Sequence, residues 1–109
     1  MNLLTNTEEM ILLVVWRLQE NAYSLTIHKE ISKLSGKKWS LGSIYMPLER
    51  LVKKRLLTTF LSDITPERGG RHKRIYELTE EGKAALNNTR EIKEKVWAGI
   101  PKFVVGDQK

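Results

Sequence analysis

The fold is decided by residues 40–82, which read SLGSIYMPLERLVKKRLLTTFLSDITPERGGRHKRIYELTEEG. Apolar residues recur at spacings of three and four in the first part of this stretch, a pattern typical of a helix with one face on a core: Leu41, Ile44, Tyr45, Leu48, Leu51 and Val52. Ser40 is a favourable N-cap for this helix. Pro47 removes one backbone hydrogen bond, and we expect the helix to continue through it with a bend.

The second part of the stretch predicts a β-hairpin followed by a helix. Residues 57–61 and 74–78 are rich in residue types that favour strands. The turn between them carries two adjacent glycines and four basic residues: Arg68, Arg71, Lys73 and Arg74. Such a loop can follow a phosphate backbone, because glycine lets main-chain N–H groups approach phosphate oxygens. On its own the loop is equally compatible with a solvated hairpin tip.

Two more helices are predicted upstream. The first runs from Asn6, as N-cap with Glu9 completing a capping box, to about Gln19. The second spans residues 24–35, where Ile27, Ile31 and Leu34 share one face and Gly36 follows as the C-terminal stop. Helix, short turn, helix and hairpin in this order indicate a mostly α-helical fold with a small β-hairpin wing, a winged helix-turn-helix over residues 1–82.

Residues 79–109 form a last helix and tail that continue directly from this domain. The helix is expected to begin after Thr79 and to end near Ala98, before Gly99 and Pro101. A chain this small has little remaining core for its apolar residues, so we expect a homodimer that covers them; a monomer with the helix folded back on the first helix is the alternative. We assign to the dimer interface or an effector pocket Trp16, Ile92, Val96, Trp97 and Ile100, although Trp16 also suits the core.

Composition restricts the classes of function. The chain has 109 residues, 40% hydrophobic content and no cysteine, which predicts one domain without disulfides or thiolate metal sites. No apolar run is long enough to span a bilayer, and we expect a cytoplasmic protein. Residues 21–74 hold twelve Lys and Arg against four acidic residues, a net charge of +8 within a total of +6. This basic block is typical of a surface that binds nucleic acid.

The sequence argues against an enzyme. It contains no paired carboxylates, no nucleophile with an adjacent base and no metal-ligand spacing, and His28 and His72 lie in separate segments. We therefore expect neither a cofactor nor a metal. A winged-helix module that binds another protein, with only non-specific DNA affinity, stays open as the alternative to a DNA-binding regulator.

The ordered set of motifs resembles the PadR family of bacterial transcriptional regulators, in its short subfamily. The resemblance is carried by residues 40–51 (SLGSIYMPLERL), 54–57 (KRLL) and 69–82 (GGRHKRIYELTEEG). It implies a dimeric repressor with a winged helix-turn-helix in each subunit and a C-terminal helix that packs on the other subunit. Arg55 departs from the pattern, because many members have glycine there. Members of the short subfamily bind flat aromatic compounds between tryptophans of the last helix, so Trp97 is either an effector-pocket residue or interface core.

These observations predict contacts with double-stranded DNA at a pseudo-palindromic operator, where the two recognition helices enter successive major grooves. Positioning or reading of the DNA is assigned to the exposed face of helix 40–54: Ser40, Ser43, Pro47, Arg50 and Lys54. Tyr45 is expected to reach a phosphate with its hydroxyl while its ring faces the core. The phosphate backbone is assigned to the wing: Arg68, Arg71, His72, Lys73 and Arg74.

Overall fold

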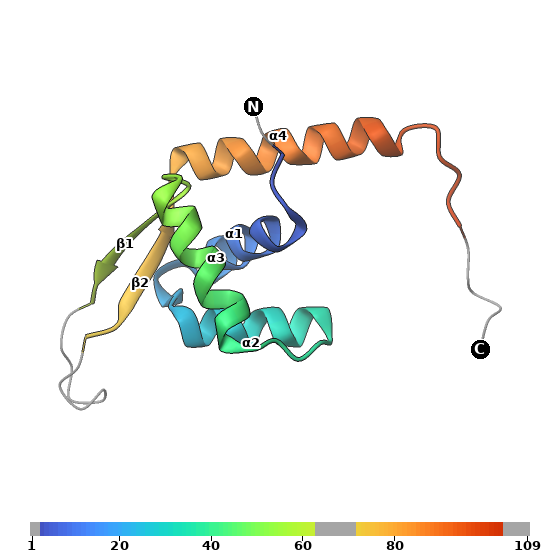
Figure 1. The fold of residues 1–109 in the computed structure, drawn as a ribbon. Helices are drawn as coiled ribbons and strands as arrows, with labels where there is room; N and C mark the ends of the chain where they lie inside the picture. The colour runs from blue at the N-terminus through green and yellow to red at the C-terminus, as the bar shows by residue number, and fades with distance from the viewer. Residues whose placement is uncertain (1–2, 63–71, 104–109) are drawn as a thin grey trace.

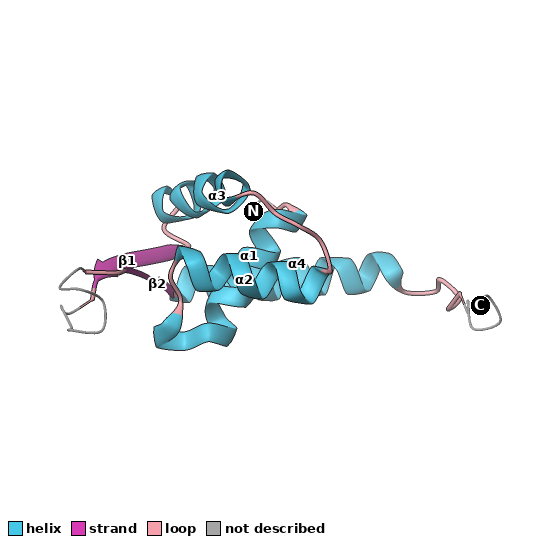
Figure 2. Ribbon diagram, turned by 90° about the horizontal axis from the view of Figure 1, so that it is seen from below, coloured by secondary structure: helices cyan, strands magenta, loops and turns pink. Residues whose placement is uncertain are grey.

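The computed structural model of the chain describes residues 3–62 and 72–103. Their elements follow in the order α1 (Asn6–Leu18), a short 3₁₀ turn (Gln19–Asn21), α2 (Ser24–Ser35), α3 (Leu41–Lys53), β1 (Leu57–Leu61), β2 (Arg74–Leu78) and α4 (Glu80–Trp97) (Figure 1). In the view from below, α3 forms one edge of the domain and the hairpin projects at one end (Figure 2). The predicted fold class, mostly helical with a two-stranded hairpin and a C-terminal helix, is confirmed.

The core forms around α1, which contacts α2, α3, α4 and β2. Ile11 and Leu12 of α1 are fully buried, and so are apolar residues of the other helices and the hairpin: Ile27, Leu48, Leu51, Leu57 and Tyr76, each at most 1% exposed. These side chains pack in one core cluster with residues from other helices and strands. Burial of such a side chain contributes on the order of 1.5–3 kcal/mol.

Side-chain caps fix where the helices begin. Ser40 and Thr79 cap α3 and α4 as predicted, because the Ser40 hydroxyl accepts from the Ser43 N–H and the Thr79 hydroxyl accepts from the Gly82 N–H. The prediction for α1 is wrong by one residue. Thr5 is its N-cap, and its capping box is completed by Glu8 rather than Glu9.

The hairpin consists of the two predicted strands, with the antiparallel register Leu57↔Leu78 through Leu61↔Arg74. Its second strand is also tied to the helical part, since the Tyr76 N–H donates to the Ala22 carbonyl oxygen at 2.8 Å. The side chain of Tyr76 is 1% exposed. The hairpin therefore starts from a fixed base on the core.

The start of α4 lies directly on the segment that follows α3. A Cβ atom at Gly82 would stand 2.3 Å from the Leu56 carbonyl oxygen, so only glycine permits this approach. Arg55 adopts φ 65°, the left-handed region that favours glycine, which gives a physical reason for the glycine of the family pattern at this position. At its other end α4 extends away from the domain (Figure 1).

Several residues expected in the core are exposed. Leu34 at the end of α2 is 53% exposed, Leu41 at the start of α3 is 59% exposed, and Trp16 is 43% exposed. Helical spacing predicts the correct face in general, but Leu34 and Leu41 lie at helix ends that no other described element covers. The core interpretation of Trp16 is wrong for the single chain.

Candidate nucleic-acid interface

The turn between α2 and α3 is held by side chains of both of its ends. His28 Nε2 donates to the Trp39 carbonyl oxygen, and Trp39 Nε1 donates to Ser35 Oγ at 3.0 Å. Gly36, in the left-handed conformation with φ 70°, ends α2 as predicted. These contacts fix α3 relative to α2, the arrangement that presents the second helix of a helix-turn-helix.

One side of α3 is left uncovered, and we call it the α3 exposed face. Its residues are Leu41, Ser43, Tyr45, Met46, Arg50 and Lys53. The structure brings three predicted site residues to this side of the molecule: Ser40 is exposed at the N-cap, its Oγ lies 2.7 Å from Ser43 Oγ, and Arg50 follows Ser43 by two turns. Leu41, Met46 and Lys53 were not predicted as site residues, although their helical spacing from Ser43 and Arg50 was a usable signal.

Two predictions for α3 are wrong. Pro47 is buried rather than part of the exposed face, because it is three residues after Ile44 and four before Leu51 and so lies on their buried stripe. Tyr45, whose ring was expected on the core, is 47% exposed. More of its side chain than the hydroxyl alone is therefore accessible to a partner.

Lys54, predicted to contact DNA, is bound within the chain. Its Nζ lies 2.6 Å from Oε2 of Glu8, a residue that is only 4% exposed. Burial by itself raises the pKa of the Glu8 carboxyl, but the hydrogen bonds from Lys54 and from the Thr5 N–H more than offset it, so the pKa is lowered. Lys54 therefore neutralises a buried carboxylate.

Glu49 of α3 holds the second strand of the hairpin, a role that the sequence did not indicate. Its Oε2 lies 3.7 Å from Nη1 of Arg74 and accepts a hydrogen bond from the Tyr76 hydroxyl at 3.4 Å. Arg74 Nε also donates to Thr59 Oγ1 at 3.3 Å. Burial raises the pKa of Tyr76 to about 12, so its hydroxyl stays protonated, and can donate, well above neutral pH. The α3 helix and the wing are thereby aligned with each other.

Two further predicted wing residues lie at the base of the turn. The Nζ of Lys73 lies 3.9 Å from the ring centroid of Tyr23, a cation–π contact. His72 is exposed, and its Nδ1 donates to the Ser62 carbonyl oxygen. Arg68 and Arg71 lie outside the described residues. The structure thus places His72, Lys73 and Arg74 beside the helix-turn-helix.

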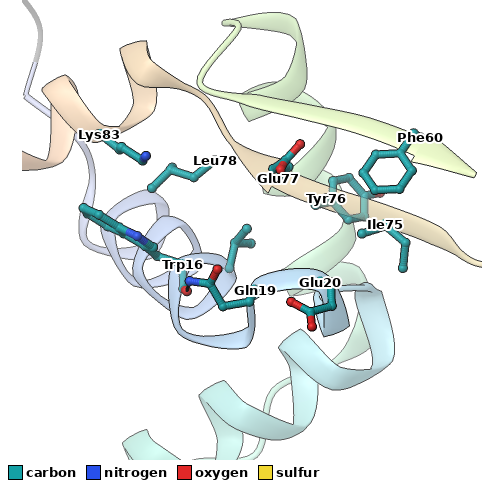
Figure 3. Close-up of a pocket in the computed structure, with 10 residues that line it drawn as sticks. Trp16, Gln19, Glu20, Phe60, Ile75, Tyr76, Glu77, Leu78 and Lys83 are labelled. Atoms are coloured by element: carbon teal, nitrogen blue, oxygen red, sulfur yellow. Dashed lines mark hydrogen bonds between the residues drawn. The ribbon is translucent and has the colours of Figure 1, made fainter. Parts of the chain in front are cut away.

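A pocket of about 200 Å³ lies between the end of α1, the hairpin and the first turns of α4 (Figure 3). Trp16 forms one wall, with Lys83 Nζ 5.6 Å from its ring centroid, and Phe60 and Ile75 line the strand side. The four residues of the last helix that were grouped with Trp16 do not line this pocket. Val96, Trp97 and Ile100 are instead exposed at the far end of α4, and Ile92 is half-buried.

No three or more His, Asp or Glu side chains within the described residues are placed to hold a metal ion. None of the helices in residues 3–62 and 72–103 combines the length and the hydropathy that crossing a membrane requires.

Solved structures of regulators have the same fold. The chain is similar to a PadR-like transcription factor of Bacteroides fragilis, with 25% identity over 82% of this chain and 81% of the other and a TM-score of 0.68. A PadR-like transcriptional regulator of Bacillus cereus has 26% identity, covers 82% of each chain and gives a TM-score of 0.67. RosR of H. salinarum has 26% identity over 90% of this chain and 81% of its own, with a TM-score of 0.66. No curated protein sequence is significantly similar to the chain.

The sequence profile of one family covers most of the winged domain. It is described as the transcriptional regulator PadR-like family, and it matches residues 11–88, from the core of α1 to the first half of α4. Its members are transcriptional regulators and not enzymes, in agreement with the helix-turn-helix and hairpin described above. The chain therefore belongs to the transcriptional regulator PadR-like family.

Proposed function

We propose that the chain is a cytoplasmic, homodimeric, sequence-specific DNA-binding protein that represses transcription at a pseudo-palindromic operator. The observation that carries this proposal is the α3 exposed face, which lies next to a hairpin whose base holds His72, Lys73 and Arg74. In this arrangement α3 enters the major groove while the wing follows the adjacent phosphate backbone.

The residues of the α3 exposed face suit a DNA groove chemically. Arg50 offers a planar fork to guanine or to a phosphate, and the Ser43 hydroxyl can donate or accept. Leu41 and Met46 are 59% exposed each, and apolar atoms of this kind contact the thymine methyl group. Lys53 and the wing residues supply positive charge for the backbone.

The dimer is supported by the apolar residues at the end of α4. Val96 is 71%, Trp97 68%, Ile100 58% and Phe103 79% exposed in the single chain. A cluster of exposed large apolar side chains marks an interface more often than a free surface. Two chains joined there carry two α3 helices, and a dimer reads two half-sites about 34–36 Å apart.

We also propose that a small flat aromatic compound releases the repressor from DNA. The supporting observation is Trp97, whose exposed indole offers a stacking surface at the end of α4. Quenching of tryptophan fluorescence by a panel of planar dyes tests this part, with a Trp97→Phe variant as the control. Equal quenching in both proteins contradicts the assignment to Trp97.

The first experiment is fluorescence-anisotropy titration with the DNA upstream of the protein's own gene and with a scrambled duplex of equal length, at two salt concentrations. We expect preference for the upstream DNA by roughly a thousandfold or more, the usual margin of specific over non-specific binding. Equal and steeply salt-dependent binding to both duplexes contradicts specificity at this operator. No binding at low salt overturns the DNA-binding function and favours a protein partner.

A further inference from the structure

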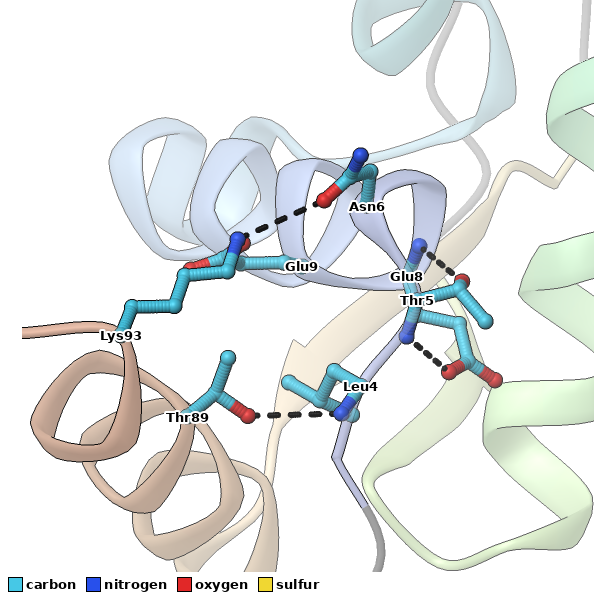
Figure 4. A network of polar contacts seen from close by, with 7 residues as sticks. All are labelled: Leu4, Thr5, Asn6, Glu8, Glu9, Thr89 and Lys93. Atoms are coloured by element: carbon cyan, nitrogen blue, oxygen red, sulfur yellow. Dashed lines mark hydrogen bonds and ion pairs between the residues drawn. The ribbon is translucent and has the colours of Figure 1, made fainter. Parts of the chain in front are cut away.

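Residues 4–9, which include the first turn of α1, contact both α4 and the end of α3, and we call them the N-terminal strap. Figure 4 shows the contacts of the strap with Thr89 and Lys93 of α4. The Leu4 N–H donates to Oγ1 of Thr89 on α4 at 3.4 Å, and the next N–H, that of Thr5, donates to Oε1 of Glu8 at 3.0 Å. Thr89 is fully buried, and Leu4 is 9% exposed. Consecutive amides of the strap therefore bind α4 and the Glu8 carboxylate, which completes the capping box of α1.

The same carboxylate reaches the end of α3. Oε2 of Glu8 accepts a hydrogen bond from Nζ of Lys54, the C-cap residue of α3, at 2.6 Å. Glu8 thus uses one oxygen for the strap backbone and the other for α3. Through this buried side chain, the strap adds a polar link between α3 and α4 to the core that both helices share with α1.

A second attachment lies one turn further along α4. Lys93 Nζ contacts Oε1 of Glu9 at 2.5 Å and Oδ1 of Asn6 at 3.4 Å. Thr89 and Lys93 are four residues apart and so lie on one face of α4. The strap therefore holds the middle of α4 at two successive turns.

The beginning of α4 is held separately. Gly82 lies against the Leu56 carbonyl oxygen, and the Thr79 hydroxyl donates to the Arg55 carbonyl oxygen at 2.8 Å. Leu86, one turn after Gly82, is 6% exposed and packs in the core, so the first turns of α4 are anchored on the domain. The strap contacts at Thr89 and Lys93 extend this anchoring along the next two turns and so hold the direction of the helix towards its far end.

The direction of α4 has a large effect at its far end. From Gly82 to Trp97 the helix rises about 22 Å, at about 1.5 Å per residue. A tilt of about 10° moves that end by about 4 Å, close to the rise of one base pair, about 3.4 Å. If two chains meet at this end, the direction of α4 decides how far apart the two α3 helices stand.

We infer that the N-terminal strap, through Thr89, Lys93 and Glu8, sets the half-site spacing that the dimer accepts. The inference rests on the proposed function, because it requires a dimer that reads two half-sites. These residues lie apart from the α3 exposed face and are positioning residues. They select among operators by geometry and contact no base.

The strap is tested first without DNA. The sequence has no cysteine, so spin labels at Lys53→Cys on α3 and Lys95→Cys on α4 are the only ones present. Labelled protein diluted with unlabelled protein reports the distance within one chain by double electron–electron resonance. We expect a narrow distribution in the parent protein and a broader or shifted one with Thr89→Val and Lys93→Gln.

Matched control variants distinguish the loss of the strap contacts from a general effect of changing a residue of α4. Arg90→Gln also removes a cation from α4, but its partner Glu94 is on the same helix and outside the strap. It should leave the distribution unchanged, and Thr89→Ser, which keeps the hydroxyl, should restore it. If the double variant Thr89→Val/Lys93→Gln fails to fold, the distance distribution is measured with Lys93→Gln alone. An unchanged distribution in the strap variants overturns the inference.

The second arm uses the operator found by anisotropy, with its half-sites moved by one or two base pairs in either direction. The parent protein should prefer one spacing by roughly tenfold, equivalent to about 1.4 kcal/mol, and the strap variants should lose this preference while binding a single half-site equally well. A uniform loss at every spacing overturns the inference. Failure of the parent to tell the operator from scrambled DNA instead overturns the proposed function, whatever the spin labels show.

Discussion

Some basic side chains near α3 form ion pairs within the chain, and others are available to a binding partner. Lys54 pairs with the buried Glu8, and Arg74 lies beside Glu49. Arg50 and Lys53 are exposed, and neither has an acidic partner among the described residues. A partner on this surface therefore meets Arg50 and Lys53 without first breaking an internal ion pair.

Arg50 and Lys73 should differ in their effect on DNA binding. We expect Arg50→Ala to weaken operator binding by about 1–3 kcal/mol, roughly 5- to 150-fold, and to relax the preference at one base position. Lys73→Ala should weaken operator and scrambled duplex alike and reduce the salt dependence. Anisotropy titrations with single-base operator variants distinguish the two patterns.

Arg90→Ala is the matched control, because Arg90 is an exposed cation on α4 that pairs with Glu94 within its own helix. It should leave both affinities unchanged. Equal losses on operator and scrambled DNA for Arg50→Ala would remove Arg50 from base reading and leave it a phosphate contact.

Glu8 should make stability depend on pH in the acid range. Its folded-state pKa is lowered from 4.5, so its contribution is present above that value and is lost as the pH falls through the folded-state pKa. We expect Glu8→Gln to lower the free energy of unfolding by on the order of 1 kcal/mol at pH 7, with a smaller difference near pH 3. Urea denaturation at both pH values measures this.

The control for Glu8 is Glu94→Gln, which removes an exposed carboxylate from an intrahelical ion pair. Its effect should stay within about 0.5 kcal/mol at both pH values. A difference between Glu8→Gln and the parent that does not change with pH would show that the charge of Glu8 contributes nothing.

For the helices and strands, the sequence predicts where an element begins and ends better than which of its side chains are buried. Ser40, Thr79 and Gly36 mark helix ends correctly, because a cap is a local interaction between residues a few positions apart. Pro47 and Tyr45 were placed on the wrong side, because burial depends on which distant element covers each position. Glu49 gave no signal, since its partners on β2 are 25 and 27 residues away.

The contact between α4 and the end of α3 depends on one glycine. In Gly82→Ala the new Cβ would stand 2.3 Å from the Leu56 carbonyl oxygen and 2.6 Å from Leu78 Cδ1, so the backbone must move. We expect a loss of about 1–3 kcal/mol in the free energy of unfolding. Thermal and urea denaturation measure the loss.

Gly42 of α3 provides the comparison for Gly82. A Cβ there meets only Ser40 Oγ, at 4.0 Å. Gly42→Ala should therefore leave stability unchanged or raise it by up to about 1 kcal/mol, because alanine is the better helix former. If both alanine variants behave alike, the close approach at Gly82 is not what holds α4.

In the whole molecule, the surface proposed for DNA and the surface proposed for a second copy of the chain lie apart from each other. The α3 exposed face and the wing carry basic side chains, whereas the end of α4 carries exposed apolar side chains and extends away from the domain (Figure 1). The sequence predicted this division, since its basic block is in residues 21–74 and the last helix has no net excess of charge. It could not predict how the strap joins the two, because Glu8 to Lys54 and Leu4 to Thr89 are contacts across 46 and 85 residues.

Trp97 should be required for association of the chains. We expect a dimer at micromolar concentration for the parent and, for Trp97→Lys, weakening by about 2 kcal/mol or more, roughly 30-fold, as for an interface aromatic. Lysine suits the last turn of a helix, and Trp97 is 68% exposed in the single chain, so the fold should persist. Size-exclusion chromatography with light scattering, and circular dichroism as a check on the fold, measure both.

Lys95→Ser changes an exposed residue two positions earlier on α4 and should leave the mass unchanged. A Trp97→Lys protein that stays dimeric over the same concentrations would show that the dimer interface lies on another surface.

The contact of Glu49 with Arg74 and Tyr76 has a consequence for protein engineering. A chimaera that receives only residues 41–53, to transfer the DNA preference of this protein onto another scaffold, brings Glu49 without the two side chains it aligns. No such contact would then fix the angle between the transplanted helix and the hairpin of the recipient protein. The smallest portable unit is therefore the helix together with β2, exchanged as one cassette.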